Sequence, residues 1–157
     1  MKTSLEKARD QTHKDTVNVL QGIIEKNYDA EKGYKKAMQD AKNPALKNFL
    51  KQQAVQRSTF ATAIDKELRD LDEAPKESGS VTGSLHRAWI DIKSSVAGNE
   101  DEAVLEEVIR GEKASVEEYE DVMKKHTLAP KIQNVLQSQL KDIQGTLNRV
   151  KTLEDIV

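Results

Sequence analysis

The stretch that decides the fold is residues 43–72, which read NPALKNFLKQQAVQRSTFATAIDKELRDLD. Asn43 and Pro44 open it as a typical helix start, with an N-cap side chain followed by a proline at the first helical position. The apolar side chains then recur every three or four residues, which is the period of one helical face. They are Leu46, Phe49, Leu50, Phe60, Ile64, Leu68 and Leu71. The stretch predicts a long amphipathic helix, and two polar residues inside its stripe, Gln53 and Arg57, require an explanation.

The same period recurs in three other segments of the chain. A first helix is predicted over about 14–42, a third over 80–124 with an interruption near Gly98, and a fourth over 130–153. No segment shows the alternating polarity of a half-buried strand. The fold class is therefore all-α, and the expected architecture is an antiparallel four-helix bundle. The loop-like residues 73–79 are the expected crossover between helices two and three.

Composition limits the architecture and the chemistry. A chain of 157 residues has the length of one domain, and a charged fraction of 33% with only 4% aromatic residues favours helices. We predict a flexible polar lead-in over 1–12 and a single bundle domain over 13–157. The absence of cysteine excludes disulfides, thiolate metal sites and thiol catalysis.

The charge pattern bears on partners and location. The net charge is −2, so the sequence has no strongly basic footprint for nucleic acid or for an anionic membrane. No segment approaches the roughly 20 apolar residues that span a bilayer, and the charged N-terminus does not resemble a signal peptide. We expect a cytoplasmic protein that binds neither nucleic acid nor membrane. A homodimer is the partner considered, since most soluble oligomers are symmetric dimers.

Polar side chains interrupt the apolar stripes at mid-depth of the expected bundle. Burying such groups is costly unless they pair with one another, so we predict one internal polar layer in which Arg57 neutralises Glu31 or Glu112. The alternative is that the helical phases are wrong. The residues of the predicted layer are Asn27, Glu31, Gln53, Gln56, Arg57, Glu112, Gln139 and Asp142.

Four motifs are distinctive in their order and spacing. They are Glu31-Lys32-Gly33-Tyr34, Gln56-Arg57-Ser58-Thr59-Phe60-Ala61, GSVTGSLHRAWIDIKS at 79–94, and the stretch from Leu105-Glu106-Glu107 to Arg110-Gly111-Glu112. Together they resemble a bacterial domain-of-unknown-function family of ferritin-like four-helix-bundle proteins, over about 15–153. The resemblance implies an up-down-down-up bundle and no particular activity. Ferritin-like relatives store iron, reduce dioxygen or act on peroxide.

The ligand inventory bears on whether the layer could hold metal. Di-iron carboxylate bundles carry single glutamates on two helices and a Glu-x-x-His pair on each of the other two. Glu31 and Glu112 could fill the single positions, but the pairs are replaced by Gln53-x-x-Gln56 and Gln139-x-x-Asp142. Both histidines are absent and the site would lack charge. We expect no metal or other cofactor; if a metal binds, its ligands would be Glu31, Glu112 and Asp142.

Three functional interpretations follow from these residues. The leading one is a non-enzymatic ferritin-like bundle with a structural or binding role, related to stress through that kinship, with no catalytic residues. The alternative is a divalent-metal-binding protein or di-iron-type oxidoreductase that uses Glu31 and Glu112 with iron or manganese. A third is a ligand carrier with a cavity near Tyr34, Phe60, Trp89 and Tyr119.

Overall fold

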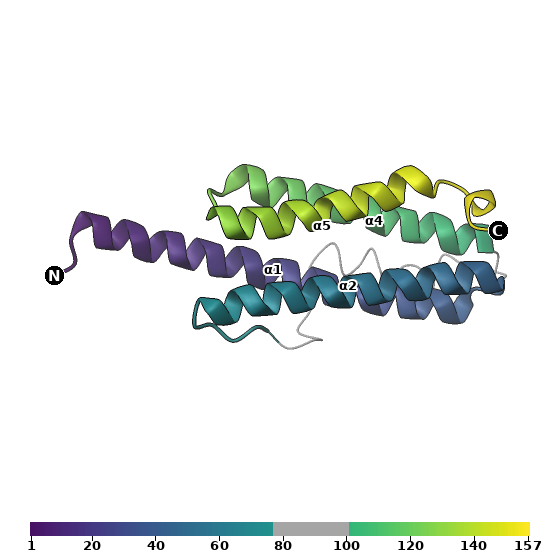
Figure 1. The fold of residues 1–157 in the computed structure, drawn as a ribbon, viewed down its shortest axis with the longest axis horizontal. Coiled ribbons are helices and arrows are strands. Elements are labelled where there is room, and N and C mark those ends of the chain that lie inside the picture. The colour runs from purple at the N-terminus through teal and green to yellow at the C-terminus, as the bar shows by residue number, and fades with distance from the viewer. Residues whose placement is uncertain (77–100) are drawn as a thin grey trace.

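The computed structural model describes residues 1–76 and 101–157, and within these two ranges it contains helices and no strands. The prediction of an all-α four-helix bundle is confirmed (Figure 1). The predicted helical residues 80–98, with the interruption near Gly98, lie outside the described residues, as do His86 and Trp89. None of the helices in the described part carries an apolar stretch long enough to cross a membrane.

The first helix, α1 (Ser4–Asp40), is continuous over 37 residues. A capping box starts it: the Thr3 hydroxyl accepts from the Glu6 amide at 3.2 Å, and the Glu6 carboxylate accepts from the Thr3 amide at 2.8 Å. The predicted start near Lys14 is therefore too late. The capping box satisfies the first backbone donors even though residues 4–14 bury no apolar face. The flexibility of residues 1–12 stays a prediction.

The second helix, α2 (Pro44–Asp70), begins where the sequence predicted. The Asn43 side chain accepts from the amides of Ala45 and Leu46 at 2.8 and 3.2 Å, and Pro44 occupies the first turn. The preceding link is only three residues long, so α1 and α2 pack as an antiparallel hairpin. Local chemistry at Asn43-Pro44 thus fixes the first half of the bundle.

The second helical pair consists of α4 (Asp101–Lys125) and α5 (Pro130–Arg149), followed by a short 3-10 helix, η1 (Leu153–Asp155). The predicted extension of the last helix to Leu153 is wrong. Val150 leaves the helix in an extended conformation, and both Val150 and Leu153 pack on the core. Burial of these two side chains accounts for the break in the helix.

Asp101 joins the two helical pairs. Its carboxylate accepts from the backbone amides of Lys42 at 2.8 Å and Asn43 at 2.9 Å. The start of α4 therefore lies beside the start of α2, and these two helices run in the same direction while α1 and α5 run opposite to them (Figure 1). The end of α2 and the start of α4 lie at opposite ends of the bundle, which is the crossover expected from the sequence.

The core is divided into two apolar clusters along the bundle axis. One contains Ala30, Tyr34, Ala37, Leu46, Leu50, Val104, Leu105 and Val108, and the other contains Leu20, Ile23, Ile24, Phe60, Ile64, Tyr119, Leu136 and Ile143. Asn27 separates the clusters on α1, Arg57 separates them on α2, and Glu112 separates them on α4. The three polar residues that interrupt the apolar stripes thus lie at one level between the two apolar clusters.

Candidate functional site

Three helices bring an amide, a guanidinium and a carboxylate to the same depth. Asn27, Arg57 and Glu112 are 0, 1 and 2% exposed. Each lies on the inward stripe of its helix, which places all three side chains in the centre of the bundle. Burying a charged pair at this depth is costly, and each further hydrogen bond to the pair offsets part of that cost.

Arg57 is the centre of the resulting contacts. One terminal nitrogen, Nη2, donates to Glu112 Oε1 at 2.8 Å, and Nη1 donates to Asn27 Oδ1 at 3.0 Å. The flat guanidinium fork therefore ties α2 to both α4 and α1. Within the described residues this is the most deeply buried of the ion pairs.

Two tyrosines extend the contacts to either side. The Tyr34 hydroxyl donates to Glu112 Oε1. The Tyr119 hydroxyl accepts from Asn27 Nδ2 at 2.8 Å and donates to Gln139 Oε1 at 2.7 Å. We call the six connected residues the buried network: Tyr34, Glu112, Arg57, Asn27, Tyr119 and Gln139.

The ends of the buried network are closed by backbone carbonyls. Gln139 Nε2 donates to the carbonyl of Phe60 at 3.2 Å, and Asn27 Nδ2 also reaches the carbonyl of Ile23 at 3.0 Å. Through these bonds, side chains from α1, α2, α4 and α5 are connected in the centre of the bundle. A shift of any helix along its axis would break at least one of them, so the network fixes helix register.

Burial sets the protonation of the network. It raises the pKa of Tyr34 well above its ordinary value, and the Glu112 charge raises it further. Burial also raises the pKa of Tyr119 to about 12. Burial on its own would lower the pKa of Arg57, but Glu112 and the two tyrosines outweigh it and the pKa is raised. Both hydroxyls are thus fixed as donors and the guanidinium as a cation at neutral pH.

Some buried atoms next to these contacts are not bonded. Within residues 1–76 and 101–157, Glu112 Oε2, Arg57 Nε and the side-chain oxygens of Gln53 and Gln56 have no hydrogen-bond partner. Both glutamines precede Arg57 on α2. Gln53 is buried and lies one turn before Arg57, and Gln56 is half-buried and directly precedes it. The two glutamines predicted for the layer therefore lie near it in sequence without joining the network.

Two carboxylates predicted for the layer lie elsewhere, which corrects the expectation. Glu31 is half-buried and pairs with Lys35 at 2.9 Å on its own helix, and Asp142 is exposed on α5. The reason is helical phase. Glu31 follows Asn27 by four residues and is turned about 40° from it, whereas a residue seven on is turned only about 20° to the other side. Tyr34 occupies that better-aligned position.

The sequence reasoning missed the roles of the two tyrosines. The sequence pattern places Tyr34 and Tyr119 on apolar helical faces and beside a possible ligand cavity, and not in the polar layer. Each lies seven residues after a polar stripe residue, Tyr34 after Asn27 and Tyr119 after Glu112, so each stands two turns along the same face. That spacing is the signal that would have identified them, because a buried tyrosine hydroxyl needs a partner.

The network does not fit the ligand set of a metal centre. Glu112 is its single carboxylate, and Oε1 of that group already accepts from Arg57 and Tyr34. A guanidinium bonded to the carboxylate opposes a second positive charge. In the part of the chain that the structure describes, no three histidine or acidic side chains gather into a possible metal site. Glu31, Glu112 and Asp142, which were named as ligands for the case that a metal binds, are not brought together.

Comparisons with known proteins give one result. A family model described as a domain of unknown function (DUF2383) matches residues 15–125. A search of curated proteins finds no match to the chain. The matched range includes five residues of the buried network, and Gln139 lies beyond it.

Proposed function

The chain belongs to the DUF2383 family of domains of unknown function, and from that premise we propose that it is a non-enzymatic ferritin-like bundle with a structural or binding role. The supporting observation is the Arg57–Glu112 pair at the centre of the buried network. An acid that serves catalysis or metal binding is expected to face a substrate or ion, whereas Glu112 Oε1 faces the Arg57 guanidinium and the Tyr34 hydroxyl and Oε2 is buried without a partner among the described residues. Here the pair is used to connect helices.

The ferritin-like part of the proposal is supported by helix directions. The order up, down, down, up, with α2 and α4 parallel, is the one that the family resemblance implies. In such a bundle the mid-depth layer is where carboxylates would bind metal. Arg57 stands at that level in this chain, so we propose that an internal ion pair replaces the metal centre as the element that holds the four helices together.

The setting is proposed from the resemblance rather than from geometry. We propose a bacterial, cytoplasmic protein with a stress-related role, acting through its outer surface on another protein or a second copy of itself. Surface charge supports an outward role: exposed lysines at 32, 42, 47 and 51 gather where α1 ends and α2 begins, and α4 carries exposed acids at 102, 106 and 117. Complementary charge of this kind guides association.

Metal analysis of purified protein tests the non-enzymatic proposal. The chain is produced without chelator, and iron and manganese are measured together with consumption of dioxygen and peroxide. We expect metal far below one ion per chain and no consumption above that of buffer. Glu112→Gln and the surface variant Glu31→Gln are measured beside it. Stoichiometric metal that is lost in Glu112→Gln would refute the proposal and favour the oxidoreductase alternative.

A second measurement addresses the structural part of the proposal. The triple variant Tyr34→Phe, Arg57→Met and Glu112→Leu removes the central charges but keeps apolar volume, and apolar replacement of a buried ion pair is often tolerated. We expect this variant to fold. In cells that produce it, the variant should crosslink to the same proteins as the natural chain does. If the triple variant folds but loses those crosslinks, the function depends on the buried side chains and the proposal of a surface role is refuted.

A further inference from the structure

The N-terminal part of α1 extends beyond the rest of the bundle. Figure 1 shows it projecting past the ends of the other helices, and residues 1–14 are exposed throughout. We call residues 4–14 the arm. Leu5 is 60% exposed, and Ala8, Arg9 and Thr12 lie on the same helical face one and two turns further on. A helix ending that exposes its largest apolar side chain has a surface suited to a partner.

The charges of the arm leave one cation beside that apolar side chain. The acids of the arm are already engaged, Glu6 with the Thr3 amide and Asp10 with Lys2. Arg9 has no ion-pair partner within the described residues and follows Leu5 by one turn. The arm therefore presents a leucine with an adjacent free guanidinium.

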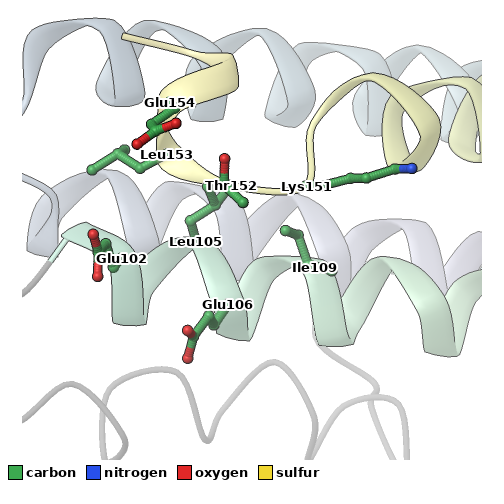
Figure 2. Close-up of a pocket in the computed structure, with 8 residues that line it drawn as sticks. All are labelled: Glu102, Leu105, Glu106, Ile109, Lys151, Thr152, Leu153 and Glu154. Atoms are coloured by element: carbon green, nitrogen blue, oxygen red, sulfur yellow. The ribbon is translucent and has the colours of Figure 1, made fainter.

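A hollow of matching character lies at the other end of the molecule. It has a volume of about 320 Å³ and lies between the first half of α4 and the C-terminal segment. Leu105, Ile109 and Leu153 supply its apolar side chains. Figure 2 shows the C-terminal segment crossing over α4, with Glu102 and Glu154 toward one end of the hollow and Lys151 toward the other. We call this the C-terminal groove.

The C-terminal groove is held open by fixed contacts. The Asp155 carboxylate accepts from the amides of Lys151 at 2.8 Å and Thr152 at 3.0 Å, which fixes the turn that forms one wall. Leu153 and Ile156 pack on the core cluster beneath. Glu102 and Glu154 are exposed and have no ion-pair partner within the described residues. The groove thus presents a preformed apolar floor with two free carboxylates at one end.

We infer that the C-terminal groove binds the arm of a second copy of this chain, with Leu5 on the apolar floor and Arg9 beside Glu102 and Glu154. This deepens the proposed binding role and rests on it. A copy cannot fill its own groove, because the groove packs near Ala37 and Ala41, about 50 Å along α1 from Leu5 at 1.5 Å per residue. The contact joins two different surfaces, so it is head-to-tail and adds copies in a row or closes a ring.

The contact predicts weak, salt-sensitive association. A few turns of helix on a small groove bury less than a standard interface, so a dissociation constant of about 10 to 100 µM is expected. Added salt should weaken it through the Arg9 contact. Sedimentation velocity of the full chain over a concentration series should show species larger than a dimer. A chain that stays monomeric at about 1 mM would overturn the inference, since this is well above the expected constant.

Two blocked variants give the decisive experiment. The arm-blocked chain carries Leu5→Ser with Arg9→Ser, so that the blocked arm is uncharged at these positions, and the groove-blocked chain carries Glu102→Lys with Glu154→Lys. Each should associate at least about tenfold more weakly than the natural chain, because burial of a leucine and a charge contact are lost. Mixed together, they retain one intact arm and one intact groove and should form a 1:1 complex that grows no further.

Matched controls separate this contact from general charge effects. Lys7→Glu lies on the opposite face of the arm and Glu117→Lys lies on α4 away from the groove, and both should leave association unchanged. Circular dichroism of each variant checks that it folds. Dimers that persist in both blocked variants, or a mixture that forms no complex, would refute the arm-to-groove contact. Metal content is measured separately, so failure here leaves the non-enzymatic proposal standing.

Discussion

Removing one charge of the Arg57–Glu112 pair should destabilise the bundle far more than removing both. The single variant is Arg57→Met, which keeps a long unbranched side chain and deletes the guanidinium. Glu112 then remains 2% exposed without the nitrogen that bonds it at 2.8 Å. Asn27 also loses the donor at 3.0 Å to its side-chain oxygen.

The magnitude follows from these lost contacts. Stranding one member of a buried ion pair costs about 3 to 5 kcal/mol of the free energy of unfolding. An unpaired buried amide oxygen costs about 1 kcal/mol or more in addition. In the triple variant with Tyr34→Phe and Glu112→Leu, no charge is stranded and the hydroxyl that needed Glu112 is gone. Its free energy of unfolding should lie within about 2 kcal/mol of the natural chain.

Urea unfolding followed by circular dichroism measures both variants. The matched control is Lys35→Met, which makes the same kind of change in the half-exposed pair with Glu31 and should cost about 1 kcal/mol or less. The urea concentrations at the unfolding midpoints are compared. If the dependence of the unfolding free energy on urea concentration is the same in all variants, a shifted midpoint reports a change in stability and not in compactness. An Arg57→Met chain as stable as the control, or a triple variant no better than the single one, would refute the pairing.

Further predictions concern the tyrosines and the link between helical pairs. Tyr34 and Tyr119 have raised pKa values, so their stabilisation is complete below pH of about 10, the unfolded value, and is lost as pH rises toward the folded value. In an alkaline absorbance titration the half-buried Tyr28 should ionise before the other two tyrosines, Tyr119 should ionise near pH 12, and Tyr34 should ionise only with unfolding; three tyrosines ionising together would contradict this. Asp101→Ala should lower the free energy of unfolding by about 1 to 3 kcal/mol, because two amides lose a charged acceptor. Glu102→Ala next to it should change the free energy of unfolding by less than about 0.5 kcal/mol. If thermal unfolding shows equal effects for the two variants, the Asp101 carboxylate does not stabilise the link between the helical pairs.

Local signals in the sequence were sufficient for most helix boundaries. Asn43-Pro44 and Pro130 start helices where predicted, because capping and the fixed proline φ act within one turn. The start of α1 was missed although Thr3 and Glu6 form a local capping box. Residues 4–14 have little apolar periodicity, so the stripe pattern by itself does not mark them as helical.

The composition of the buried network was harder to predict. Arg57, Glu112, Asn27 and Gln139 were expected in one layer, and the structure connects them. The expectation failed for Glu31, whose position at the edge of the stripe lets its carboxylate reach Lys35 instead. An error of a few tens of degrees in helical phase is enough to exchange a buried for a half-exposed position.

The sequence by itself determined the helical class, the antiparallel first hairpin and the presence of polar groups in apolar stripes, because all of these depend on neighbours within two turns of the chain. Only the tertiary structure decided that Arg57 bonds Glu112 and Asn27, that two tyrosines complete the network and that the first turns of the arm project past the other helices (Figure 1). Those outcomes depend on the relative rotation and length of four helices, which the periodicity of any one helix leaves undefined.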